Sequence, residues 1–107
     1  MRRPLETVTL AGVMDELARR GFTEHFTVAG GQLRGVESGK TFPADEATIA
    51  EFHRFEGVSD PDDMSILYAI ETRSGLRGTL ADAFGVYADP RVGAFMTGVA
   101  FGSSRSR

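Results

Sequence analysis

Three aspartates around one proline form the first group of side chains that could do chemistry. Asp60, Asp62 and Asp63 flank Pro61, and the Asp-Pro step predicts a turn there. Closely spaced carboxylates on a turn can bind a hard divalent cation such as Mg²⁺ or Ca²⁺. The EF-hand pattern is absent, however, and aspartates on turns also accept hydrogen bonds from nearby backbone N–H groups. A cation site and a structural turn are therefore both open interpretations, and no other cofactor is predicted.

A glutamate and a histidine lie just before this turn, two residues apart in a predicted strand. Alternate side chains share one face of a strand, so Glu51 and His53 project together, roughly 7 Å apart. Histidine titrates near neutral pH, which suits the pair to metal binding or acid–base chemistry. On the opposite face, Arg54 and Glu56 could form an exposed ion pair that contributes little stability.

One further carboxylate lies in an apolar strand. Asp82 shares a face with Leu80, so its charge needs a partner such as an arginine, the Tyr68 hydroxyl or a backbone N–H. Such a group is either a satisfied structural link or part of a pocket. No catalytic residue can be assigned. The candidate ligand-binding residues are Glu51, His53, Arg54, Glu56, Tyr68 and Asp82, and the candidate metal ligands are Asp60, Asp62 and Asp63.

The composition restricts the class of protein. With 107 residues, of which 41% are hydrophobic and 25% charged, the chain predicts a single globular domain over residues 1–101 and a disordered tail over 102–107. The absence of cysteine excludes disulfides, thiolate zinc sites and cysteine nucleophiles. No apolar run approaches the ~20 residues that cross a bilayer, so we expect a cytoplasmic protein without a membrane segment. A net charge of −3 makes nucleic-acid binding an unfavoured hypothesis.

Helical signals stand at both ends of the chain. Apolar residues spaced three and four apart predict a helix over Leu10–Arg20, which Gly21 ends. Asp89-Pro90 predicts the start of a second helix, with aspartate as the N-cap and proline in the first turn.

Strand signals fill the middle of the chain, at Phe22–Val28, Gln32–Val36, Thr48–Phe55, Met64–Glu71 and Arg77–Phe84. Gly30-Gly31 is typical of a hairpin turn. A helix from Pro43 through Glu51 is the alternative to the strand at Thr48–Phe55. Met64–Glu71 is apolar on both of its faces, which indicates a central strand that is covered on both faces. The order predicts an α+β fold: an antiparallel sheet of about five strands with N- and C-terminal helices packed on one face.

The stretch EFHRFEGVSDPDDMSILYAI, followed by GLRGTLADAFGVYADP, resembles a family of small bacterial proteins of about this length. Members are often labelled phosphoribosylpyrophosphate synthetase, a label that implies transfer of a pyrophosphoryl group from ATP to ribose phosphate. In the phosphoribosyl-pyrophosphate loop an acidic pair follows an apolar strand, whereas Asp62 and Asp63 precede one here. The chain also lacks an ATP-binding motif. The resemblance therefore supports the family and not the activity in its label.

Two hypotheses for function follow. The first is a non-catalytic domain that binds a protein partner or a small effector and forms a homodimer, because a small sheet with one open face often covers it with a second copy. The alternative is an enzyme that depends on a divalent cation, or a protein that binds a phosphorylated ligand, and that uses the acidic segment 51–63.

Overall fold

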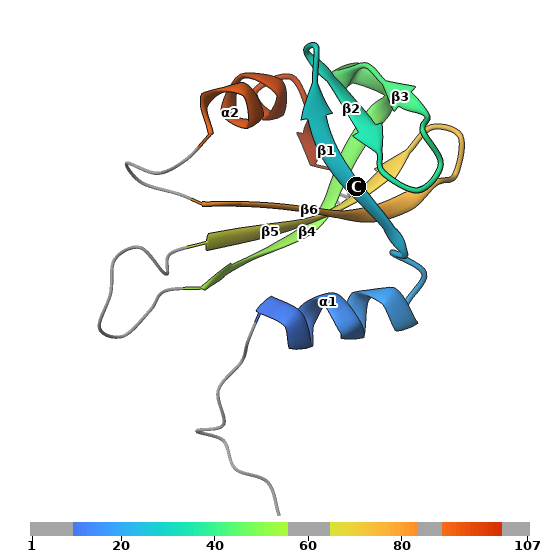
Figure 1. The fold of residues 1–107 in the computed structure, drawn as a ribbon, viewed down its shortest axis with the longest axis vertical. Coiled ribbons are helices and arrows are strands. Elements are labelled where there is room, and N and C mark those ends of the chain that lie inside the picture. The colour runs from blue at the N-terminus through green and yellow to red at the C-terminus, as the bar shows by residue number, and fades with distance from the viewer. Residues whose placement is uncertain (1–9, 56–64, 84–88, 102–107) are drawn as a thin grey trace, which may run out of the picture.

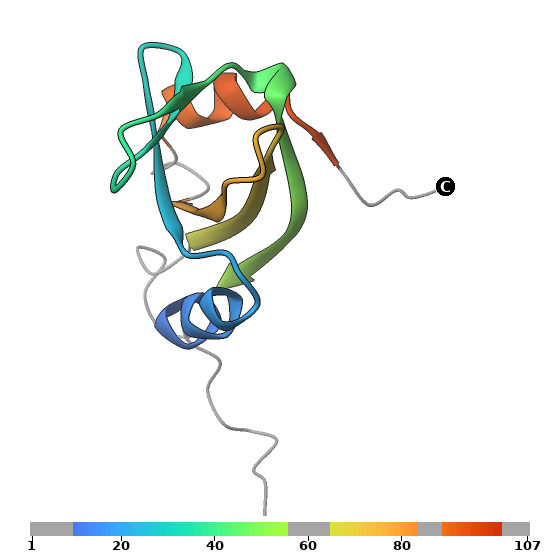
Figure 2. The same cartoon turned by 90° about the vertical axis from the view of Figure 1, so that its right-hand side faces the viewer.

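A mixed sheet curls into a half-barrel in the computed structural model, which describes residues 10–55, 65–83 and 89–101 (Figures 1 and 2). Within these ranges the sheet has seven strands in the order β3-β2-β1-β6-β5-β4-β7. The strands are β1 (Glu24–Ala29), β2 (Gln32–Gly35), β3 (Thr41–Phe42), β4 (Ala47–Phe55), β5 (Ser65–Thr72), β6 (Arg77–Ala83) and β7 (Ala100–Phe101). The helices are α1 (Leu10–Arg19) and α2 (Pro90–Met96), with one 3-10 turn at Ala44–Glu46.

The predicted fold class is wrong in strand number, strand direction and helix placement. The sheet is mixed, because β1 runs parallel to β6 and β7 runs parallel to β4. Strands β3 and β7 have two residues each, too few to produce the alternating pattern that predicts a strand. The remaining pairs are antiparallel, and the hairpin between β5 and β6 agrees with the prediction.

The two helices lie on opposite faces of the sheet, as both views of the ribbon show (Figures 1 and 2). On one face, Leu17 of α1 packs in a cluster with Leu67 and Ala69 of β5. On the other, α2 contributes Val92, Phe95 and other side chains to the larger core, which includes Ile70 of β5. Because neighbouring residues of a strand point to opposite faces, β5 is buried on both sides.

Helix α1 ends as its glycine predicts, one residue earlier than the predicted boundary. Gly21 has a φ of 101°, a left-handed conformation that costs glycine little. The N–H of Phe22 donates to the carbonyl of Leu17 at 2.9 Å, and that of Gly21 donates to the carbonyl of Ala18 at 3.0 Å. These two bonds form a Schellman motif, and the contact between Phe22 and Leu17 in one cluster completes it.

The Gly30-Gly31 hairpin is confirmed, with φ values of 60° and 77° that fit a type I′ turn. On its other side, β1 pairs with β6 at two positions. Glu24 lies opposite Gly78, and His25 lies opposite Thr79. A Cβ on Gly78 would lie 2.1 Å from the carbonyl oxygen of Glu24, so only glycine permits this approach of the two backbones.

The strand at Thr48–Phe55 is confirmed as β4, and the alternative helix is reduced to the 3-10 turn before it. Ile49 lies opposite Ile70 and Glu51 lies opposite Ala69, so Ala50 is an extra residue that forms a β-bulge. A bulge bends its strand and increases the local twist, and β4 curves strongly in Figure 2.

The second predicted helix starts where Asp89-Pro90 places it. The Asp89 carboxylate accepts the N–H of Arg91 at 2.9 Å, and Pro90 occupies the first turn. No described helix is long and apolar enough to cross a membrane. The predicted tail at 102–107, and the candidate residues Glu56, Asp60, Asp62 and Asp63, lie outside the described residues. The single-domain boundary and the cation site therefore stay predictions.

Candidate functional site

The structure brings Glu51 and His53 together on the face of the sheet that α1 covers. The Nε2 atom of His53 lies 2.8 Å from Oε2 of Glu51. Arg20, immediately after α1, donates to both oxygens of the same carboxylate at 3.1 and 2.8 Å. No local pattern predicts Arg20 at this position, since the contact joins residues that are 31 positions apart.

In the Arg20–Glu51–His53 cluster, the hydrogen bonds from Arg20 and with His53 leave the Glu51 carboxylate unavailable for proton transfer. The hydrogen bonds from Arg20, and secondly the one with His53, lower the pKa of Glu51 to about 2. At neutral pH this carboxylate is ionised, and both of its oxygens have partners, which is unsuited to a general base. The cluster instead ties the end of α1 to β4, and so its arrangement supports a structural role.

Three aromatic side chains meet on the other face of β4, at the outer edge of the sheet. The ring centroid of Phe52 lies 6.4 Å from that of Tyr68 and 6.0 Å from that of Phe101. Phe52 and Phe101 expose 44% and 60% of their surface, whereas Tyr68 is partly buried. We call these three residues the aromatic patch. Phe52 and Phe101 were not among the predicted site residues, and only the pairing of β7 with β4 brings Phe101 to this position.

Charged groups border Tyr68 on the same face. Ile66 of β5 lies two residues before Tyr68 and on the same face. Its partner on β4 is Arg54, and its partner on β6 is Asp82. Burial raises the pKa of Tyr68, the negative charge of Asp82 raises it further, and the positive charge of Arg54 opposes both. At neutral pH the phenol therefore keeps its proton and can donate a hydrogen bond.

The partner that Asp82 requires is a backbone N–H, one of the possibilities open from the sequence. The N–H of Asp89 donates to Oδ1 of Asp82 at 3.2 Å. The bond links β6 to the N-cap of α2. It makes Asp82 a structural link, with a second effect through its charge on Tyr68.

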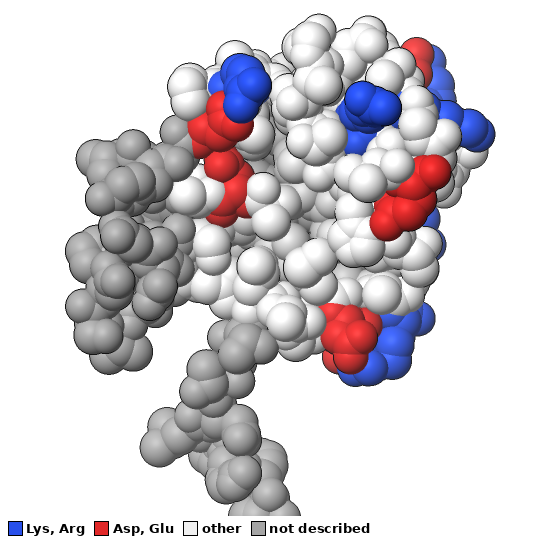
Figure 3. Space-filling view, viewed as in Figure 1, with Lys and Arg blue, Asp and Glu red and all other residues white. Residues whose placement is uncertain are grey.

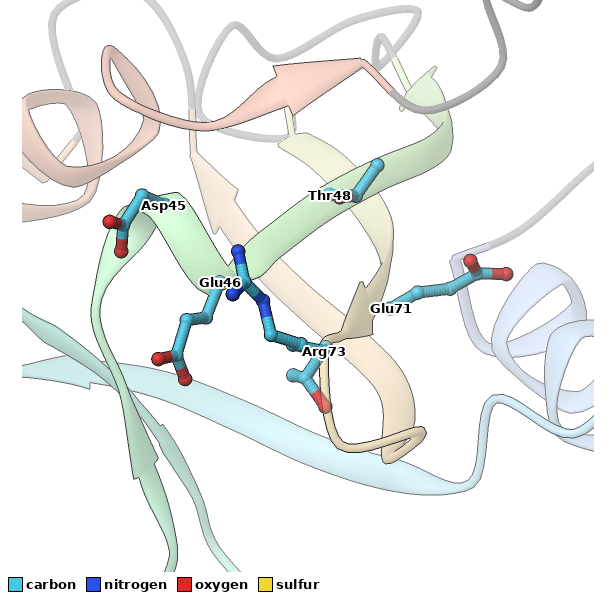
Figure 4. A pocket seen from close by; sticks show the side chains of 6 residues that line it. Asp45, Glu46, Thr48, Glu71 and Arg73 are labelled. Atoms are coloured by element: carbon cyan, nitrogen blue, oxygen red, sulfur yellow. The ribbon is translucent and has the colours of Figure 1, made fainter.

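A polar hollow of about 170 Å³ lies at the far end of β4 and β5. Its lining includes Asp45, Glu46, Glu71 and Arg73 (Figure 4). The Asp45 and Glu71 carboxylates point away from each other, and the Arg73 side chain extends between them. A divalent cation needs oxygen ligands that converge, so this arrangement is unsuited to one. In the described ranges, no group of three or more His, Cys, Asp or Glu residues could hold a metal ion.

The charges on one face of the molecule are mixed in sign. In Figure 3, lysine and arginine side chains lie beside aspartate and glutamate side chains at the rim, and much of the middle is uncharged. Nucleic-acid binding requires a continuous basic surface, which the described residues on this face do not form.

Comparison with known proteins finds no match to this chain. No protein-family model matches the chain, and neither a curated protein nor a solved structure matches it. The resemblance to small bacterial proteins stays a prediction. The geometry of the aromatic patch and the edge beside it therefore carries the functional argument.

Proposed function

We propose that this chain is a non-catalytic binding domain that works as a homodimer, with the aromatic patch as its contact surface. The observation that carries the proposal is the exposure of Phe52 and Phe101 in contact range of each other. Large apolar side chains that are exposed together mark interaction sites more often than isolated ones do. We place this function in the cytoplasm, as the sequence predicts.

The state of the acid–base pair supports a non-catalytic role. Glu51 is held by Arg20 and His53, with its pKa lowered to about 2, so it is a poor proton acceptor near neutral pH. Asp82 accepts a hydrogen bond from the backbone N–H of Asp89, the N-cap residue of α2. The described candidates for acid–base chemistry thus have structural partners, whereas Phe52 and Phe101 at the sheet edge are exposed.

The test is light scattering coupled to size-exclusion chromatography across a range of protein concentrations. We expect wild type to be a dimer, and Phe52→Ser and Phe101→Ser each to raise the dissociation constant at least about tenfold, as loss of an interface aromatic residue does.

Val36 supplies a matched control, because it is 62% exposed and lies beyond the end of β2. Val36→Ser removes an exposed apolar side chain of another region and should leave the dissociation constant unchanged. A wild type that stays monomeric at high concentration would contradict the proposal. So would patch variants that associate as tightly as wild type.

A further inference from the structure

We propose that the dimer forms when β4 pairs antiparallel with β4 of a second copy, in the register that places His53 opposite itself. The inference rests on the proposed function and adds the geometry of the contact. Its starting observation is that β7, over the residues that the structure describes, pairs with Thr48 and Ile49 of β4. Among the described residues, no strand pairs with the outer edge of β4 from Phe52 to Phe55.

An uncovered strand edge presents backbone N–H and C=O groups that another strand can bind. Proteins discourage such pairing with proline or with charged side chains, lysine above all. The segment Phe52–Phe55 contains no proline and no lysine, and its one arginine is Arg54. Its most exposed apolar side chain, Phe52, belongs to the aromatic patch. The edge and the patch therefore form one continuous surface, and a partner strand would cover both.

Symmetry restricts the possible registers of such a pair. In a two-fold dimer that extends the sheet, each face of β4 continues into the same face of the second β4. Residues directly opposite each other share a face, so the register must be centred on a residue that meets its own copy. Within Phe52–Phe55, a centre at either end pairs one residue only, which leaves His53 and Arg54 as centres.

The charges decide between these two registers. A centre at Arg54 places Arg54 opposite Arg54 of the second copy, and like charges directly opposite destabilise a strand pair. A centre at His53 places Arg54 opposite Phe52 of the second copy, and does so twice by symmetry. A guanidinium over an aromatic ring is a favourable contact. The edge is therefore complementary to itself in one register, which argues for a second copy of this chain as the occupant.

The opposite face tolerates the same register. There His53 meets His53 of the second copy, and each imidazole already has a carboxylate partner, Glu51, at 2.8 Å within its own chain. The Arg20–Glu51–His53 cluster holds both rings in place beside the two-fold axis. The cluster would therefore support the interface, because it holds β4, the strand that pairs, in position.

Cysteine cross-linking tests the register directly, because the chain has no cysteine of its own. Opposed residues of an antiparallel pair have Cα atoms about 4.5–5.5 Å apart, which fits a disulfide. His53→Cys should form a covalent homodimer under mild oxidation, at least about tenfold faster than Thr41→Cys on the exposed edge strand β3.

A second experiment keeps His53 and its cluster intact. Phe52→Cys mixed with Arg54→Cys should give a covalent heterodimer faster than either variant forms a homodimer, since Phe52 lies opposite Arg54 in the proposed register. Faster cross-linking of Arg54→Cys alone would overturn that register.

The outcomes separate this inference from the proposed function. A wild-type dimer that dissociates in the patch variants, but that cross-links neither at His53→Cys nor in the mixture, would overturn the strand pairing and leave the proposed function in place. A wild type that is a monomer throughout would overturn both. Cross-linking in both experiments would establish the pairing and its register.

Discussion

At one edge of the sheet, β3 has two residues, with Lys40 before it and Pro43 after it. At the other edge, no strand of the described residues pairs with the outer side of the second half of β4. Phe42 at the first edge and Phe52 at the second lie in different surroundings. Phe42 is 5% exposed and packs edge to face on Phe26 at 6.5 Å, whereas Phe52 is 44% exposed. The first edge is short and flanked by residues that discourage pairing, and the second has the features of a contact surface.

This difference shows that an edge strand is not a uniform liability. Lysine and proline on an edge prevent a further strand from adding to it, and burial of the aromatic side chain removes its attraction for a partner. The β4 edge has no lysine or proline from Phe52 to Phe55, and its Phe52 is exposed.

Replacing the buried aromatic residue of the β3 edge should cost far more stability than replacing the exposed one. Phe42→Ala leaves a cavity in the core, and we expect the free energy of unfolding to fall by about 3–5 kcal/mol. Phe52→Ala should lower it by less than about 1 kcal/mol under conditions in which the protein is monomeric. Urea denaturation followed by circular dichroism measures both. Equal losses would mean that the two edges are not distinct.

The ion pair between Glu51 of β4 and Arg20 should make the stability of the protein depend on pH. The folded pKa of Glu51 is about 2, below its ordinary value of 4.5, so its contribution to stability is present above pH 4.5 and is lost as the pH falls toward 2. Glu51→Gln removes the charge that Arg20 binds, so it should lower the free energy of unfolding at pH 7. The loss should be only about 1 kcal/mol, because the side chain is partly exposed and solvent screens the interaction.

The pH profile gives the control for that variant. The loss caused by Glu51→Gln should shrink as the pH falls from 4.5 to 2, where the wild-type carboxylate becomes protonated. Asp15→Asn removes an exposed carboxylate that pairs with Arg19 on α1 itself, and should change stability much less. An unchanged difference between wild type and Glu51→Gln down to pH 2 would contradict the role given to the cluster.

The smallest effect is expected where one protection of the β3 edge is removed and the others remain. Lys40→Thr takes away the lysine, but Pro43 and the two-residue length of β3 stay. We expect the free energy of unfolding to change by no more than about 0.5 kcal/mol, with the same oligomeric state as wild type. Larger assemblies in light scattering would show instead that Lys40 alone protects this edge.

The elements that were predicted correctly depend on residues close in sequence. Gly30-Gly31 and Asp89-Pro90 specify their turn and helix start through backbone angles and a local hydrogen bond. The alternation over Met64–Glu71 predicted a central strand covered on both faces, which agrees with β5 and was not carried into the prediction of both helices on one face. Leu67 and Ala69 on one face, with Ile70 on the other, indicated burial on both sides, and helices on opposite faces are what covers them.

The elements that were missed depend on contacts between distant residues. The parallel pairing of β1 with β6, and the two-residue strand β7, have no local pattern. In the site, Glu51 and His53 could be placed on one face because the bulge at Ala50 precedes both and leaves their alternation intact. Arg20 and Phe101 could not be placed, since only the folded sheet brings them to β4.

The close approach of Glu24 to Gly78 has a consequence for the order of folding. The hairpin of β1 and β2 can form early, but its attachment to β6 must wait for residues half the length of the chain away. Closing so long a loop slows folding, because its entropy is lost before the contact forms. On the ribosome, Phe26 can pack on Phe42 early, but the core that it shares with Ile70 and Leu80 is complete only after β5 and β6 emerge. In that interval the apolar surface still exposed makes the nascent chain prone to aggregate.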